Sequence, residues 1–250
     1  MEERRNAIVE MINQSGTVSF TELKSQFPDV SEMTLRRDLE YLDSNKLIVR
    51  IHGGAKSVDV VIGTDDMHTK RSMRNAEAKK QIAQKALQFL KPNTTIFMDS
   101  GTTGMELARI FPDGRYMVFT NGLLCAMEIA KRTQTQTYMI GGRVDPYSLC
   151  SSGSRTLAAL ENINLDIAFL GTTGYSSVQG FTIGAEEEYE LKREIIRRAD
   201  KAIVMMDAKK VGFAYTFTIA FPNEIDAVIS DGSLDEETLQ ELQQGGVKIY

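Results

Sequence analysis

The chain has 250 residues, of which 42% are hydrophobic and 25% are charged, and its formal net charge at pH 7 is -5. A chain of this length and composition can bury a full core, and we expect one small domain followed by one larger domain. No segment approaches the roughly 18 consecutive apolar residues of a membrane helix, and the N-terminus is charged, so we expect a cytoplasmic protein with no membrane partner.

Three short helices are predicted at the start of the chain, over residues 3–14, 21–27 and 31–42. Apolar residues recur in each of them at intervals of three and four, the spacing that gives a helix one buried face. Ser31 is a favourable N-cap for the third helix, since its hydroxyl can accept a bond from a free amide of the first turn. The apolar stripe of the third helix consists of Leu35, Leu39 and Leu42.

The third helix turns polar side chains away from this stripe. Arg36 and Arg37 are adjacent and therefore point about 100° apart, so one can reach base edges while the other reaches a phosphate or an internal carboxylate. Asp38 is the nearest carboxylate in the sequence. The alternative is that the two arginines lie on a solvent-exposed helix face and contact no DNA.

A short β-rich run, residues 47–51, follows the third helix and ends at Gly53-Gly54, which is typical of a hairpin wing. Residues 1–56 as a whole are not basic. Residues 44–57, however, contain four basic or imidazole side chains and no acid, so the wing is expected to supply a positive surface. These side chains are Lys46, Arg50, His52 and Lys56.

Three helices and a wing predict a winged helix-turn-helix. The block from Ser31 to Leu39 and the motif from His52 to Ala55 resemble the N-terminal domain of the DeoR family of bacterial transcription regulators. The resemblance implies a small α+β domain over residues 1–56 that binds double-stranded operator DNA. The expected DNA-binding residues are Ser31, Thr34, Arg36, Arg37, Tyr41, Arg50 and His52.

Residues 57–74 have no convincing period and are expected to link this domain to a second one, residues 75–250. A basic cluster around Arg71 and Lys79 leads into a predicted helix over residues 75–90. We interpret the cluster as a solvated helix face, with a supporting role at a ligand site as the alternative.

From residue 94 onward, short β-rich runs alternate with helical segments. This alternation predicts an α/β domain with a mostly parallel sheet covered on both faces. The expected strands are residues 95–98, 116–120, 137–140, 167–171, 202–206, 227–229 and 247–249. The expected helices between them are residues 104–110, 123–131, 186–199 and 235–243.

Several predicted strands are followed at once by small, polar or charged residues. Each such turn is ordinary by itself, because Gly, Ser, Asn and Asp are common turn residues. Strands of one parallel sheet bring their carboxyl ends to one edge, however, and open α/β sheets bind ligands there. Hydroxyls, an amide and carboxylates suit a polyol, while amides and lysines suit a phosphate, so we expect a phosphorylated sugar.

The second domain also resembles the DeoR sensor domain over nearly its whole length. The resemblance implies a fold similar to the sugar-phosphate isomerases and a phosphorylated sugar as effector, with the strongest contacts from Asp207, Lys210 and Lys192. The expected effector-binding residues are Asp99, Ser100, Gly101, Thr102, Thr103, Thr120, Asn121, Gly141, Gly142, Lys192, Asp207 and Lys210.

Two functions remain open at this point. The first is a transcription regulator, expected to repress a carbohydrate-utilisation operon and to bind DNA as a dimer or higher homo-oligomer. The second is a sugar-phosphate isomerase or deaminase with an appended module, in which Asp99, Glu186 or Asp207 serves as general base. Both histidines fall in the wing or the linker, so we favour the regulator and expect neither catalysis nor a metal or cofactor.

Overall fold

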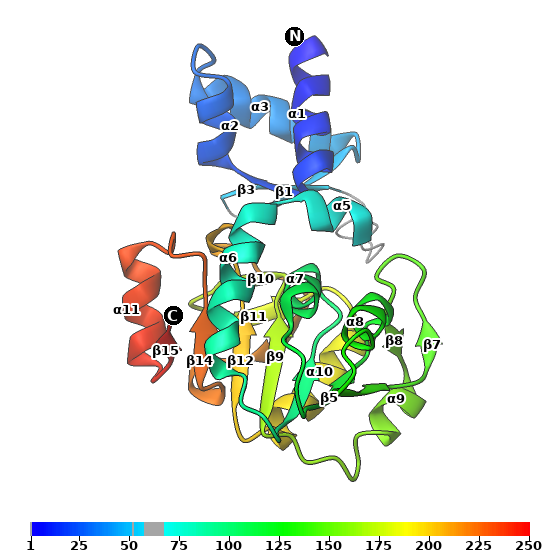
Figure 1. Cartoon of the computed structure of the whole chain (residues 1–250). Helices are drawn as coiled ribbons and strands as arrows, with labels where there is room; N and C mark the ends of the chain where they lie inside the picture. Colours follow the sequence, from blue (N-terminus) through cyan, green and yellow to red (C-terminus); the bar gives the residue numbers. More distant parts are fainter. Residues whose placement is uncertain (1, 52, 58–67) are drawn as a thin grey trace. The chain divides into compact units, whose positions relative to one another are not determined.

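The computed structural model describes residues 2–51, 53–57 and 68–250 of the chain. The chain divides into two compact units, Met1–Lys70 and Arg71–Tyr250, whose helices and strands are drawn in Figure 1. Because each unit has its own hydrophobic core, each is a domain in the physical sense.

The boundary between the units falls inside the expected connection, residues 57–74. Of this connection, residues 58–67 lie outside the described part of the chain. The residues after them form a short helix, α5 (His68–Met73), which the sequence pattern did not predict.

The first unit packs three helices against a small sheet. All three helices match their predicted ranges to within two residues, and the predicted stripe of Leu35, Leu39 and Leu42 is buried. The core also contains Ile8 and Leu23 from the other two helices. The elements of this unit are α1 (Glu2–Ser15), β1 (Thr17–Ser19), α2 (Phe20–Gln26), α3 (Glu32–Ser44), β2 (Ile48–Ile51) and β3 (Gly54–Ser57).

The sheet of the first unit has the order β1-β3-β2 with antiparallel neighbours, so β2 and β3 form the predicted wing. Gly53 has a φ of +80°, in the left-handed region that suits glycine at a tight turn. A Cβ on Gly54 would lie 2.2 Å from the carbonyl oxygen of Val18, so only glycine allows β3 to approach β1 this closely. The Gly-Gly pair is therefore required at both positions.

The second unit contains a seven-stranded sheet among its described residues, with the order β15-β14-β12-β9-β4-β5-β6. Every neighbouring pair is parallel, which confirms the predicted α/β architecture. The strands are β4 (Thr95–Met98), β5 (Met117–Thr120), β6 (Gln136–Met139), β9 (Ile167–Gly171), β12 (Ala202–Met205), β14 (Ala227–Ile229) and β15 (Lys248–Ile249).

Helices cover both faces of this sheet, as Figure 1 shows. Side chains from α6, α7 and α8 form one core with the strands, and those from α9, α10 and α11 lie on the opposite face. The bounds of these helices are α6 (Ala76–Ala86), α7 (Thr102–Ile110), α8 (Leu123–Ile129), α9 (Ser154–Ala158), α10 (Glu186–Arg198) and α11 (Glu236–Gln244).

Several short elements of the second unit were not predicted. A second sheet has the order β10-β11-β13, and β7 and β8 form a separate hairpin. These strands are β7 (Arg143–Val144), β8 (Ser151–Ser152), β10 (Gly174–Ser176), β11 (Gly180–Ile183) and β13 (Phe217–Ala220). Single turns of 3-10 helix occur at η2 (Ala208–Lys210) and η3 (Pro222–Glu224), whereas η1 (Leu87–Phe89) lies within the helix predicted over residues 75–90.

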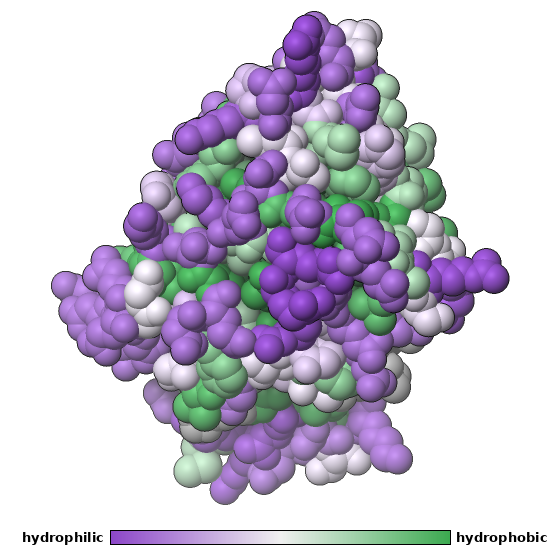
Figure 2. All heavy atoms as spheres, turned by 90° about the horizontal axis from the view of Figure 1, so that it is seen from below, coloured by the Kyte–Doolittle hydropathy of each residue, from purple (hydrophilic) through white to green (hydrophobic). Residues whose placement is uncertain are grey.

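The face of the molecule in Figure 2 carries hydrophilic side chains over most of its periphery, with hydrophobic side chains in patches between them. Within the described residues, no helix combines the length and apolar character needed to cross a bilayer.

Candidate functional site

Helix α3 begins at a side-chain cap formed by Ser31. The Ser31 hydroxyl accepts a hydrogen bond from the Thr34 amide at 3.2 Å, as predicted, and its Oγ lies 2.8 Å from the Thr34 Oγ1. The two hydroxyls therefore bond to each other at the start of the helix. This cap fixes the point at which the chain enters α3.

The sequence suggested that Asp38 could pair with a neighbouring arginine of α3, but it pairs with neither Arg36 nor Arg37. It is buried, and its carboxylate accepts bonds from the Arg4 Nε at 2.6 Å and the Arg5 Nε at 2.8 Å, both from α1. Burial alone would raise the pKa of Asp38, but the two guanidinium groups outweigh it and hold that pKa below its usual value. Asp38 therefore fixes α1 against α3 and leaves the arginines of α3 available for other partners.

The exposed side of α3 carries two cations and an aromatic ring. Arg36 is exposed, with its guanidinium 4.4 Å from the centroid of the Phe20 ring and an Nη2 atom 4.0 Å from Glu32. Arg37 is also exposed, and its guanidinium bonds to no other residue in the part of the chain that the structure describes. Tyr41 is half exposed, and the sequence did not predict that its ring supports the Arg5 guanidinium at 3.7 Å.

The wing supplies fewer positive groups than the sequence suggested. Lys46 is exposed, and the exposed Arg50 lies 3.4 Å from a carboxylate oxygen of Glu40. Lys56 is buried, and burial lowers its pKa to about 8, so it does not belong to the positive surface. His52 lies outside the described residues.

In the second unit, Asp99 follows β4 directly and is buried. Its carboxylate accepts a 2.8 Å hydrogen bond from the Gly171 amide at the end of β9 and forms an ion pair with the buried Lys192 of α10. The Lys192 ammonium also donates to the Gly171 carbonyl at 2.9 Å. Asp99, Gly171 and Lys192 thus meet at the carboxyl ends of β4 and β9. The carboxylate of Asp99 balances the positive charge of Lys192.

The turn from Ser100 to Thr103 opens helix α7 beside this pair. Gly101 occupies the N-cap position without a side-chain cap, so the first-turn amides depend on other acceptors. Gly104 lies in close contact with the strand, because a Cβ there would come within 2.4 Å of the Asp99 carbonyl oxygen. The turn therefore presents backbone amides at the same edge of the sheet.

Asn121 follows the next strand, β5, and is buried. Its amide nitrogen lies 3.4 Å from the Ser151 carbonyl, while its Oδ1 atom has no hydrogen-bond partner among the described residues. The neighbouring Thr120 is engaged locally, since its hydroxyl accepts from the Gly122 amide at 3.0 Å. Asn121 thus offers a buried acceptor, and such acceptors are normally satisfied by a protein group, a water or a ligand.

The two glycines after β6 have different roles. A Cβ on Gly142 would lie 2.2 Å from the Thr156 hydroxyl, so this glycine is required for packing against α9. A Cβ added to Gly141 would meet no heavy atom within 4 Å. The Gly141 carbonyl accepts a hydrogen bond from the Thr156 hydroxyl at 2.9 Å.

Asp207 follows β12 and is buried at the start of η2. Its Oδ1 accepts from the Asn75 side-chain amide at 2.9 Å and from the Lys209 backbone amide at 3.2 Å. Asn75 has a φ of +50°, a left-handed conformation, immediately before α6. Sequence reasoning missed Asn75, because no local pattern connects it to an aspartate 132 residues later.

Lys79 is buried beside the same aspartate, so the basic cluster is not simply a solvated helix face. Its ammonium donates to the backbone carbonyls of Arg71 and of Arg74, the latter at 2.6 Å. Burial, and after it the nearby positive charge of Lys210, lower the pKa of Lys79 to about 8, although the carboxylate of Asp207 opposes the shift. Cationic groups therefore meet at the carboxyl end of β12.

The sheet order places these groups at one edge. The strands β12, β9, β4, β5 and β6 are consecutive neighbours, so the residues that follow them lie along one line of parallel carboxyl ends. Of the three carboxylates considered as general bases, Asp99 and Asp207 are held by the bonds described above, and Glu186 is exposed. Within the described residues, no group of three or more His, Cys, Asp or Glu side chains could hold a metal ion.

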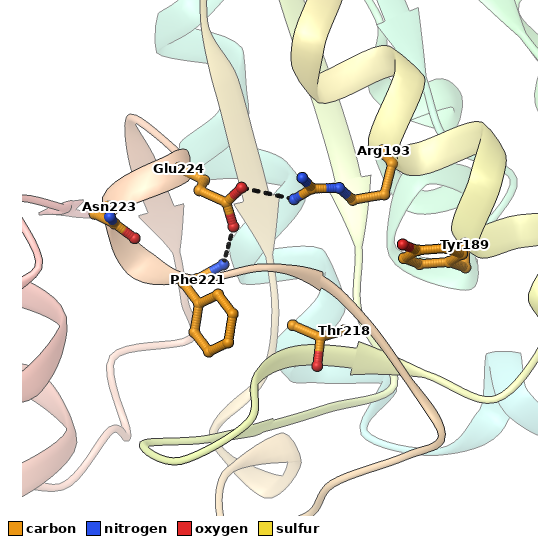
Figure 3. Close-up of a pocket in the computed structure, with 6 residues that line it drawn as sticks. All are labelled: Tyr189, Arg193, Thr218, Phe221, Asn223 and Glu224. Carbon is orange, nitrogen blue, oxygen red and sulfur yellow. Dashed lines mark hydrogen bonds and ion pairs between the residues drawn. The ribbon is translucent and has the colours of Figure 1, made fainter.

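A separate shallow groove of about 410 Å³ is lined in part by Tyr189 and Arg193 of α10 and contains none of the predicted residues. Figure 3 shows Arg193 reaching Glu224, whose second oxygen accepts from the Phe221 amide; the distances are 2.7 and 2.8 Å. Its charged groups are thus paired with each other. The lining residues are Tyr189, Arg193, Thr218, Phe221, Asn223 and Glu224.

Two family models match the chain. Residues 4–61 match a DeoR-like helix-turn-helix domain, and residues 74–232 match the DeoR C-terminal sensor domain. Together they cover both units.

Relatives align over almost the whole chain. The transcriptional regulator GolR of Listeria innocua is 31% identical, over 99% of this chain and 97% of its own length. The lactose phosphotransferase system repressor of Streptococcus mutans is 30% identical, over 97% of this chain and 96% of its own length. Both are named as regulators, so the isomerase or deaminase alternative is set aside.

Among solved structures, ribose-5-phosphate isomerase A from Methanocaldococcus jannaschii resembles the chain with a TM-score of 0.41 and 14% identity, over 55% of each chain. The family assignment itself comes from the two domain matches and the full-length relatives. The chain belongs to the DeoR family of transcription regulators, with an N-terminal DNA-binding helix-turn-helix domain and a C-terminal sensor domain.

Proposed function

We propose that this regulator represses a carbohydrate-utilisation operon and that a phosphorylated sugar, bound at the carboxyl ends of the sensor sheet, controls its hold on the operator. The convergence of buried polar and charged groups after β12, β4 and β5, at one edge of the parallel sheet, is the observation that carries this proposal. The name of the Streptococcus mutans relative, a lactose phosphotransferase system repressor, supports the carbohydrate context.

Helix α3 is the element that reads the operator in this proposal. Arg36 and Arg37 are exposed on α3. Neither is paired with Asp38, whose carboxylate is neutralised by two arginines of α1. An exposed arginine can bond to both acceptors on the major-groove edge of a guanine, or to a phosphate. The wing adds Lys46 and Arg50 for backbone contacts.

The carboxyl ends of the sensor strands offer different groups for the two halves of a sugar phosphate. The unpaired Oδ1 of Asn121 and the carboxylates of Asp99 and Asp207 are acceptors for sugar hydroxyls. Lys79 and Lys210 supply positive charge for the phosphate, and the amides of the turn before α7 supply further donors.

Lys79 also connects this edge of the sheet to the last residues of the expected connection, residues 57–74. Its ammonium bonds to the carbonyl of Arg71, within α5, and to the carbonyl of Arg74, directly after α5. A phosphate that attracts Lys79 competes with these two carbonyls. Effector binding then favours a different arrangement of this segment, which shifts the population of DNA-competent protein.

The experiment compares Lys210→Ala with Lys201→Ala, two lysines that flank the same strand β12, the second of them exposed. Thermal unfolding is recorded with phosphorylated hexoses, pentoses and ketoses and with the corresponding unphosphorylated sugars. A ligand that binds only the folded state raises the melting temperature by mass action. We expect a phosphosugar to stabilise the wild-type chain and Lys201→Ala but not Lys210→Ala.

Operator binding is measured on the same proteins. Lys210→Ala should bind operator with wild-type affinity but no longer respond to the phosphosugar. Loss of operator binding in Lys210→Ala, with the phosphosugar response intact, would refute the assignment.

A further inference from the structure

The two edges of the seven-stranded sheet are built differently. The edge strand β15 has only two residues and carries the exposed Lys248. The opposite edge strand, β6, has four residues and lies within residues 133–142, which contain no charged side chain. Short edge strands and lysines are common protections against pairing with another chain. The β15 edge has these protections and the β6 edge lacks them.

The outer backbone groups of β6 are unpaired within the described part of the chain. The Gln136 amide donates to the Tyr116 carbonyl at 2.9 Å, and the Ile140 amide donates to the Thr120 carbonyl at 2.8 Å. Alternate residues of a strand direct their amides and carbonyls to the same side, so those of Thr137 and Met139 point away from β5. Among described strands, only β5 pairs with β6.

Apolar side chains flank this open edge. The Tyr138 ring is 44% exposed, yet it is held in place by stacking on Phe119 with the centroids 4.7 Å apart. Met127 of α8, the helix that packs against β6, is 60% exposed. A rigid, half-exposed aromatic ring beside free backbone donors and acceptors is typical of a surface that a further strand covers.

We propose that a second copy of this chain pairs with β6 as an antiparallel strand about a two-fold axis, joining the two seven-stranded sheets. In the register centred on Tyr138, Thr137 of each copy exchanges hydrogen bonds with Met139 of the partner subunit. The two Tyr138 rings then lie side by side on one face, next to the two Phe119 rings.

A second copy is the occupant that fits this edge. Two-fold pairing places the same segment of both copies side by side, so a segment with charges of one sign would repel its copy, whereas the uncharged residues 133–142 do not. Each chain also carries a single recognition helix, α3. Helix-turn-helix proteins bind two half-sites through dimers, because one small module buries too little surface for tight specific binding.

Hydrogen exchange of the purified full-length chain tests the proposal at individual amides. At concentrations where sedimentation shows an associated species, the Thr137 and Met139 amides should be protected, and dilution to the monomer should remove that protection. The Gln136 and Ile140 amides bond to β5 and should stay protected at both concentrations. Fast exchange of Thr137 and Met139 in the associated species, or a monomer at every concentration, would overturn the proposal.

Substitutions test the same edge by sedimentation equilibrium. Thr137→Pro removes an outward amide without touching the ladder to β5, and the Thr137 hydroxyl has no partner to lose among the described residues. Gln136→Lys adds an edge lysine, and Gln243→Lys makes the same change at an exposed position of α11. We expect the first two to weaken association at least about tenfold and Gln243→Lys to leave it unchanged.

Circular dichroism establishes that each variant is folded. If Thr137→Pro does not fold, the association of Gln136→Lys and the hydrogen-exchange data still test whether β6 forms the interface. Wild-type association in Gln136→Lys, with unprotected Thr137 and Met139 amides, would place the interface elsewhere.

Discussion

The two units of this regulator place their charges in opposite ways. In the DNA-binding unit the buried carboxylate of Asp38 holds α1 against α3 through Arg4 and Arg5, and the arginines of α3 remain exposed. In the sensor unit, Lys79 and Lys192 at the carboxyl ends of the strands are themselves buried and bonded to groups of the protein.

The exposed arginines of α3 can bind a partner directly, whereas the buried lysines of the sensor unit must first give up bonds to protein groups. DNA can approach the exposed cations of α3 without breaking a buried interaction. In the proposed function, an anionic effector has to compete with the bonds already made by Lys79 and Lys192. Under that proposal, only the second arrangement couples binding to a rearrangement.

The largest effect that would test this comparison is expected from Lys192→Met. The substitution leaves the Asp99 carboxylate buried without its partner, so the free energy of unfolding should fall by about 4 kcal/mol. Urea unfolding measures it, with Lys201→Met as the control because Lys201 is exposed. Adding Asp99→Asn to Lys192→Met should recover part of the loss. A loss below about 1 kcal/mol, typical of an exposed ion pair, would contradict the buried pairing.

Asp38→Asn tests the corresponding charge of the DNA-binding unit. Removing the carboxylate leaves two guanidinium groups of α1 facing each other, and we expect the free energy of unfolding to fall by about 3 kcal/mol. Guanidinium chloride unfolding measures this change. Asp29→Asn, at an exposed position, should be nearly neutral. Equal stability of the two variants would show that Asp38 does not hold α1 to α3.

Arg37→Ala tests the exposed side of the comparison. The Arg37 guanidinium makes no bond to another described residue, so the protein should stay as stable as wild type while operator binding weakens by about 1 to 3 kcal/mol. Fluorescence anisotropy on operator variants measures the change and shows whether preference relaxes at one base. Arg155→Ala, an exposed arginine of α9, is the matched control. Unchanged operator affinity in Arg37→Ala would remove this residue from the DNA contact.

The smallest expected effect is the pH dependence of stability. The pKa of Asp38 is lower in the folded protein than its usual value of 3.8, so its ionised form is favoured by folding. This contribution is fully present above about pH 5 and is lost as the pH falls through the folded pKa. Acid titration of wild type and Asp38→Asn should show a weaker acid dependence in the variant. Parallel curves for the two proteins would contradict the shift.

The sequence was sufficient for every long element and for few of the short ones. Strands β4, β9 and β14 begin and end as predicted, because their apolar runs are bounded by polar or small residues. The two-residue strands β7 and β8 carry no such pattern, and their pairing depends on hydrogen bonds between distant backbone segments. The helical α5 was also missed.

The site residues divide in the same way. Local patterns indicated that Asp99, Asn121 and Asp207 follow buried strands, and the parallel sheet does bring these positions to one edge. Their partners were out of reach of the sequence, since Lys192 is 93 residues from Asp99 and Asn75 is 132 residues from Asp207. The nearest carboxylate to Arg36 in sequence, Asp38, bonds instead to α1.

The sequence by itself determined the helical and strand periods, the order of the elements and the motif from Ser31 to Leu39, because these depend on local spacing and on backbone preference. The tertiary structure alone decided which charged side chains are paired inside the protein and which stay exposed to a binding partner. Arg37 and Lys192 are both basic residues on amphipathic helices, and burial beside a carboxylate, set by packing across the sheet, is what separates them.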